Sequence, residues 1–200
     1  RSEFAGHLDR TLDGRFGDSK DMLALMAAYQ QQLEAVGLEG LGAKALPHPS
    51  GRTFVGSAAC ADCHEAEYDI WKETPHAHGT DSIVNPAERS EIPRHHDPEC
   101  LSCHVTGWNP QEFHPYKSGY VSLETTRELT QMGCENCHGP GSHHVAAENG
   151  ELDDADKYRE EMILTLGEAR DTCLQCHDLD NSPAFHLEGA FEKYWERVKH

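Results

Sequence analysis

The sequence has few of the side chains that usually fill a protein core. Hydrophobic residues make up 37% of the 200 residues and aromatic residues 8%, whereas ordinary globular domains are about 45–50% apolar. Burial of apolar surface stabilises a fold by roughly 25 cal/mol per Å². Because this chain offers little apolar side-chain surface, we expect another apolar group to fill much of its interior.

Positive charge and long apolar runs are also scarce. The chain has 17 Lys and Arg against 35 Asp and Glu, a formal net charge of −18. Nucleic acid is therefore excluded as a partner, because its phosphate backbone is bound by cations, and basic partners are favoured. No apolar run of about 20 residues is present, so we expect no membrane span. No signal peptide is visible either, and we expect one to have been removed or to lie upstream.

Cysteine is found only in one repeated motif. Four copies of Cys-x-x-Cys-His use all 8 Cys, which leaves none for a disulfide or a catalytic thiol. The thiols are those of Cys60, Cys63, Cys100, Cys103, Cys134, Cys137, Cys173 and Cys176, and the copies end at His64, His104, His138 and His177. This motif is the attachment signature of a c-type haem.

The spacing of the motif explains this chemistry. The two thiols form thioethers with the haem vinyl groups, and the following His binds the iron from the proximal side. Two four-thiolate zinc sites are the alternative, but they need no His directly after the second Cys, and all four copies have one. We therefore expect four covalently attached haem c groups, stacked as the core of a multihaem cytochrome c that is mainly α with much irregular structure.

The chain divides into two parts by pattern. Residues 1–52 are expected to contain an irregular segment, an amphipathic helix and a linker, and residues 53–200 the tetrahaem domain. From Asp18 to Gly37 the apolar residues follow helical spacing, and Gly37 is placed to end the helix. Packing within the chain is the favoured role of the apolar stripe; a missing upstream domain and a second subunit are the alternatives.

Candidate distal iron ligands come from the remaining histidines, since the chain has 15 His and only four end the motifs. His76 follows a short helix that stops at Thr74 and Pro75, and can fold back onto another haem. His95 and His96 precede the second motif. One of the two can reach an iron, and His96 is favoured. The tight turn at Gly139-Pro-Gly141 can direct the chain back, so that either His143 or His144 lies beside a neighbouring haem.

His200 ends a helix-like segment and is a candidate ligand or a frayed terminus. The predicted distal ligands are thus His76, His96, His144 and His200, while His78, His95, His143 and His186 stay open as alternatives.

These motifs together resemble the cytochrome c-554 type tetrahaem proteins over about residues 54–200. The resemblance rests on four segments: Val55-Gly-Ser-Ala-Ala-Cys60-Ala-Asp-Cys63-His64, Trp71-Lys-Glu-Thr-Pro-His76-Ala, Cys100-Leu-Ser-Cys103-His104-Val-Thr-Gly107, and Gly133-Cys134-Glu-Asn-Cys137-His138-Gly-Pro-Gly141.

The resemblance implies electron transfer through haems in alternating parallel and perpendicular pairs. It also implies that His76 crosses to another haem, and that His144 or His143 binds the iron of the first haem. In one member of the group the second haem has no distal ligand. Here His95 and His96 precede the second motif, so we expect the second haem to have a distal histidine.

Related groups suggest further possibilities. In one, such a domain follows a metallophosphatase-like domain, and residues 1–46 are similar to the joining segment. In another, tetrahaem chains polymerise into extracellular filaments, in which a His comes from the next subunit. His7 and His48 are the candidates for that role.

The sequence therefore predicts an electron carrier rather than an enzyme, with four mostly bis-His, low-potential haems and redox proteins as partners. Attachment of haem c follows export, so we expect a periplasmic or extracellular location. One alternative is a small nitrogen-oxide or oxyanion reductase, which needs an iron with an open position. The other is a subunit of an extracellular filament.

Overall fold

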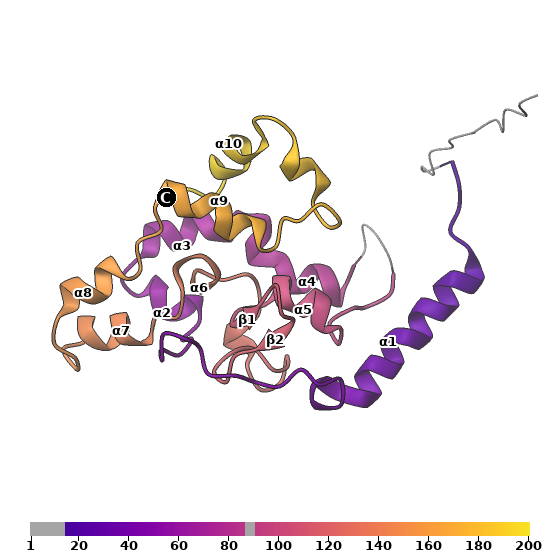
Figure 1. Ribbon diagram of the computed structural model, residues 1–200, viewed down its shortest axis with the longest axis horizontal. Coiled ribbons are helices and arrows are strands. Elements are labelled where there is room, and N and C mark those ends of the chain that lie inside the picture. The colour runs from indigo at the N-terminus through magenta and orange to yellow at the C-terminus, as the bar shows by residue number, and fades with distance from the viewer. Residues whose placement is uncertain (1–14, 87–90) are drawn as a thin grey trace, which may run out of the picture.

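The computed structural model describes residues 15–86 and 91–200 (Figure 1); His7 lies outside them. Short helices joined by irregular chain make up most of this part. The α-helices are α1 (Lys20–Gly40), α2 (Ser57–Ala61), α3 (Glu65–Lys72), α4 (Gly79–Val84), α5 (Pro98–His104), α6 (Glu135–His138), α7 (Ser142–Glu148), α8 (Ala155–Glu160), α9 (Leu166–Leu174) and α10 (Ala190–Trp195). The prediction of a mainly α fold with much irregular structure is confirmed.

Three single-turn 3-10 helices and one small sheet complete the described elements. The 3-10 helices are Pro75–His78, Arg127–Leu129 and Pro183–His186. Strand β1 (Trp108–Asn109) pairs antiparallel with β2 (His114–Pro115). None of the described helices is long and apolar enough for a bilayer crossing.

Helix α1 is the longest of the described helices. Its N-terminal end extends away from the body in Figure 1, while its C-terminal end lies near β2 and α5. At Gly37 the backbone leaves helical geometry, with φ 68° and ψ 166°, before a further turn ends at Gly40. Glycine adopts such a positive φ at little cost, so the regular helix ends where the sequence predicts.

The packed side-chain core is formed around α5 and the small sheet. Six buried side chains form one cluster: Ile83, Leu101, Val105, Trp108, Tyr120 and Leu129. Trp108 Nε1 donates a hydrogen bond of 2.8 Å to the carbonyl oxygen of Tyr120, which satisfies its buried N–H. The cluster is small for a chain of 200 residues, as the composition predicts.

The segment between α1 and α2 runs along the body. Leu46 forms a parallel bridge with Tyr116, and the Thr53 carbonyl accepts from the N–H of Ser142 at 3.2 Å. Just beyond, the N–H groups of Val55 and Gly56 reach the Glu135 carboxylate at 2.8–3.1 Å. These contacts fix the chain that leads into the first Cys-x-x-Cys-His motif.

Candidate functional site

Each Cys-x-x-Cys-His motif is one turn of helix. The first bridges α2 and α3, the second ends α5, the third forms α6, and the fourth begins in the last turn of α9. In three of them the N–H of the His bonds to the carbonyl of the first Cys, at 2.9 Å for His64, 3.0 Å for His138 and 2.8 Å for His177. This is the helical i to i−4 bond. The turn therefore presents both thiols and the imidazole together.

The thiols show which motifs are neighbours. Cys60 and Cys134 share a hydrogen bond, which raises the pKa of the Cys60 thiol and lowers that of Cys134. Cys103 and Cys176 share another, which raises the pKa of Cys176 and lowers that of Cys103. The first motif therefore adjoins the third, and the second adjoins the fourth.

An electrostatic interaction between two further thiols links the two pairs of motifs. After burial, which is the main cause, the nearby Cys173 thiol raises the pKa of Cys137. The third and fourth motifs are therefore also close together, and the four motifs form one continuous group.

The motif histidines are oriented through Nδ1. His104 Nδ1 lies 2.7 Å from the carbonyl oxygen of Gly79, and His138 Nδ1 lies 2.7 Å from that of Met162. Because a carbonyl only accepts, both nitrogens carry the proton and leave Nε2 as the metal-binding atom. Metal-ligating histidines commonly donate their other N–H in this way.

The other two motif histidines have side-chain partners. His177 Nδ1 is 2.9 Å from the Ser182 hydroxyl. His64 Nδ1 is 4.0 Å from a Glu67 carboxylate oxygen, which is an ion-pair distance and not a hydrogen bond.

Three motif histidines each face another histidine from a distant part of the chain. The ring centroids are 6.2 Å apart for His64 and His144, 6.1 Å for His177 and His76, and 5.7 Å for His138 and His200. Imidazole nitrogens bind a metal at about 2.0–2.1 Å, so two rings on opposite sides of one ion have centroids about 6 Å apart. Each pair is therefore spaced to hold one iron.

His76 is suited to this role because it is neutral. Burial, and to a lesser extent His177, lower its pKa to about 4. A neutral imidazole keeps a lone pair for a metal. Burial likewise lowers the pKa of His138 and His177.

The structure places His96 in different surroundings. Its ring lies 4.2 Å from that of His95, and its Nε2 lies 3.7 Å from a carboxylate oxygen of Glu34 on α1. Ligation of the second haem by His96 stays a prediction.

The remaining candidate histidines contact other groups. His143 packs edge-on against Tyr158 at 5.4 Å, and His48 against Tyr116 at 4.7 Å. His78 lies 3.7 Å from Asp81, and His186 Nε2 lies 2.8 Å from the carbonyl oxygen of His177.

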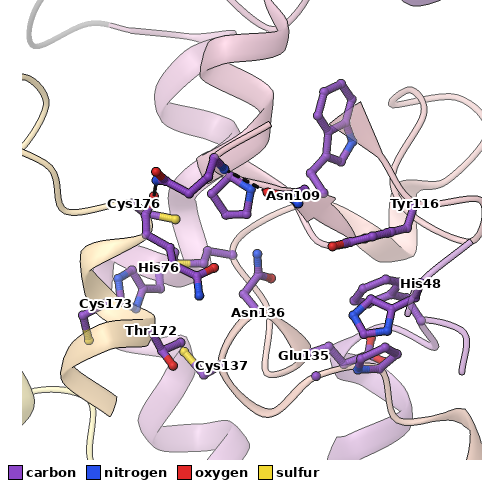
Figure 2. A pocket seen from close by; sticks show the side chains of 18 of the residues that line it. His48, His76, Asn109, Tyr116, Glu135, Asn136, Cys137, Thr172, Cys173 and Cys176 are labelled. Atoms are coloured by element: carbon purple, nitrogen blue, oxygen red, sulfur yellow. Dashed lines mark hydrogen bonds between the residues drawn. The ribbon is translucent and has the colours of Figure 1, made fainter. Parts of the chain in front are cut away.

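A cavity of about 510 Å³ separates the third and fourth motifs from the β1–β2 region. Its lining includes Cys137, Cys173, Cys176 and His177, together with His76. Figure 2 shows the labelled cysteines and His76 on one side, and His48 and Tyr116 on the other. Its volume falls within the range of sites for organic cofactors, about 300–1,000 Å³. Paired thiols, facing imidazoles and aromatic walls fit a covalently attached porphyrin.

Glu135 is a site residue that the sequence reasoning missed. Its side chain is buried, and its two oxygens accept hydrogen bonds from the N–H groups of Val55, Gly56 and Gly141. Burial raises its pKa, and the three backbone donors partly offset that effect. The carboxylate thus ties the chain before the first motif to the third motif and to the turn that leads to His144. The sequence feature that could have singled out Glu135 is its charge, because it lies between the two cysteines of the third haem motif.

Comparisons with known proteins find c-type cytochromes. Residues 59–139 match the family model described as cytochrome c554 and c-prime. Cytochrome c-554 of Nitrosomonas europaea is 34% identical over 98 residues, which cover 44% of this chain and 39% of that protein. The solved reduced state of cytochrome c554 from Nitrosomonas europaea superposes with a TM-score of 0.51 at 22% identity, over 74% of this chain and 84% of that one.

Four haem-attachment motifs on this fold define a c-type multihaem cytochrome, a class that serves electron transport. Within that class the chain is similar to the tetrahaem cytochromes of the c554 type, and its eight cysteines are compatible with four covalently attached haem c groups. It spans 39% of the length of the curated relative that it matches.

Proposed function

We propose that this protein passes single electrons along four haems, at least three of which are bis-His ligated. Each haem iron supplies one-electron chemistry, and its axial ligands help to set the potential. The observation that supports the proposal best is the set of facing histidines about 6 Å apart. Two imidazoles that held one iron would suit electron transfer and would leave that iron closed to a substrate.

The ligand sets proposed from these distances are His64 with His144, His138 with His200, and His177 with His76. His96 is retained from the sequence as the candidate for the second haem. The polypeptide's part is to hold each imidazole in one orientation. For His138 this is done through the Met162 carbonyl, and for His200 through a contact of 3.1 Å between Nδ1 and the Val198 carbonyl.

The thiol contacts support a linear order of motifs, first–third–fourth–second. Cys60 adjoins Cys134, Cys137 adjoins Cys173, and Cys176 adjoins Cys103. The first and second motifs are at the two ends of this order. We therefore propose these two motifs as the ends of the electron path.

Partners and location follow from charge and chemistry. A net charge of −18 favours redox partners with a basic docking surface, which long-range attraction would steer toward this protein. Haem attachment after export supports a periplasmic or extracellular location. Residues 53–200 are proposed as the electron-transfer domain and residues 1–52 as its N-terminal extension.

The adjacent residues His143 and His144 give a matched test of the ligand sets. His144→Ala should convert one haem from low to high spin and let it bind cyanide or carbon monoxide, with all four haems still attached. His143→Ala should leave the spectrum unchanged, because His143 faces Tyr158.

Two results would contradict this account. A spectrum unchanged by His144→Ala would remove that residue from the ligand set. Binding of external ligands to the unaltered protein at two or more haems would favour the alternative function, a small nitrogen-oxide or oxyanion reductase.

A further inference from the structure

Helix α7 places a carboxylate beside the distal ligand proposed for the first haem. His144 and Glu148 are four residues apart on α7, so their side chains lie on the same face of the helix. Glu148 Oε1 lies 3.8 Å from Nδ1 of His144. That Nδ1 is buried, and no hydrogen-bond partner for it occurs in the described part of the chain. Because Nδ1 lies beside Glu148, Nε2 is the ring nitrogen that is left to bind an iron.

Glu148 is held in this place by Arg159 of α8. Helices α7 and α8 pack side by side (Figure 1). Arg159 donates from Nε to Glu148 Oε1 at 2.7 Å and from Nη2 to Oε2 at 2.8 Å. Such a two-point contact fixes the position and the plane of a carboxylate, and the guanidinium favours its ionised form. Glu148 therefore presents a fixed negative charge to His144.

The carboxylate is close to both imidazoles proposed for the first haem. Besides its contact with His144, Glu148 interacts electrostatically with His64, whose ring centroid is 6.2 Å from that of His144. The motif histidines of the second and third haems differ, because their Nδ1 atoms face the carbonyl oxygens of Gly79 and Met162 at 2.7 Å. A carbonyl oxygen is neutral overall, so the first pair of histidines has a full negative charge where those two have a neutral acceptor.

We propose that Glu148 is a positioning residue that lowers the potential of the first haem through His144. This role depends on the proposed function, because His144 must be an axial ligand for Glu148 to act through it. Loss of one electron from the iron adds one positive charge to the site, and a fixed carboxylate nearby stabilises that charge. A carboxylate beside a metal-bound histidine also makes the imidazole a stronger donor, which acts in the same direction. The first haem is at one end of the proposed electron path, and a lowered potential makes it give up its electron more readily.

A redox titration of the haem-loaded protein, followed by electron paramagnetic resonance, tests this role. Glu148→Gln should raise the midpoint potential of one low-spin haem, the one whose signal His144→Ala removes. Loss of a partner of a metal-bound histidine typically changes metal affinity about 10–100-fold. We expect about a tenfold change in the ratio of ferric to ferrous iron, which is about 59 mV for one electron.

Asp156→Asn is the matched control. Asp156 also binds Arg159, at 2.8 Å, so this change removes one negative charge and one contact of the same guanidinium but leaves Glu148 in place. It should leave the potential of the first haem nearly unchanged, which separates the charge beside His144 from a change in net charge or in the packing of α7 on α8. Glu148→Asp keeps the charge and should raise the potential less than Glu148→Gln does. The haem spectrum of each variant verifies that it has folded.

The outcomes separate the role of Glu148 from the ligation by His144. If His144→Ala opens one haem and Glu148→Gln leaves its potential unchanged, or Asp156→Asn raises it equally, Glu148 has no such role and the ligand sets still stand. If His144→Ala leaves every low-spin signal in place, His144 is not a ligand, and both the ligand set and the role of Glu148 are overturned.

Discussion

The second and fourth haem motifs have very different surroundings. The second ends α5, where Leu101, Val105 and Trp108 are at most 3% exposed and pack together. The fourth lines the cavity of about 510 Å³, and its His177 is flanked by the rings of Phe185 at 4.7 Å and Tyr194 at 5.5 Å. Side chains pack against one another beside the second motif, whereas the fourth motif lines a cavity whose size fits a haem.

The difference shows how a chain of low hydrophobicity can fold. One small cluster of aliphatic and aromatic side chains holds α4, α5 and β1 together, and we propose that the rest of the molecule is arranged around its cofactors. We therefore expect the C-terminal third to depend on haem more strongly than the region around the small sheet.

The largest effect is expected from removing haem attachment at one motif at a time. Cys173→Ser with Cys176→Ser should remove the haem at the fourth motif, so residues 161–200 should open locally and become sensitive to protease. The matched pair, Cys100→Ser with Cys103→Ser, should lose its haem yet keep residues 98–130 protected, because side chains pack that region. Limited proteolysis with mass mapping distinguishes them, and equal sensitivity in both variants would refute the contrast.

A smaller effect is expected from the side-chain core itself. Leu101→Ala removes a buried side chain and should lower the free energy of unfolding by about 2–5 kcal/mol. Leu179→Ala, at a residue that is 66% exposed, serves as the control and should change it little. Chemical denaturation of the haem-loaded proteins measures both. A Leu101→Ala protein as stable as its control would show that haem, rather than this cluster, holds the second region as well.

The smallest effect is expected at Glu135, whose carboxylate ties the segment before the first motif to the third motif. Glu135→Gln keeps the shape but replaces one accepting oxygen with an N–H₂ group, so a backbone N–H of Val55, Gly56 or Gly141 loses its acceptor. A buried donor without a partner costs about 1–3 kcal/mol. Thermal unfolding should show this loss, and the exposed change Glu188→Gln should not. Equal melting curves would assign Glu135 no part in joining the first and third motifs.

The sequence was informative where chemistry is encoded locally. The Cys-x-x-Cys-His spacing predicts each attachment turn because the thiols and the imidazole lie within five residues. The helical spacing of the apolar residues from Met22 to Val36 predicts α1, and Gly37 its end. Low hydrophobicity predicts a small side-chain core, and the structure shows one.

The sequence was less informative where partners come from distant segments. Nothing local chooses between His143 and His144; the fold turns one toward Tyr158 and the other toward His64. His96 was proposed from its position just before the second motif, but the docking of α1 brings Glu34 to it. Glu135 was not singled out, because its three backbone donors come from two other segments.

The most direct test of the account is the electron paramagnetic resonance spectrum of the fully oxidised protein, integrated to count ferric centres by spin state. The facing pairs of histidines predict at least three low-spin bis-imidazole haems for each chain. Two or more high-spin centres, or low-spin centres with methionine as an axial ligand, would contradict the ligand sets on which the proposed electron path depends.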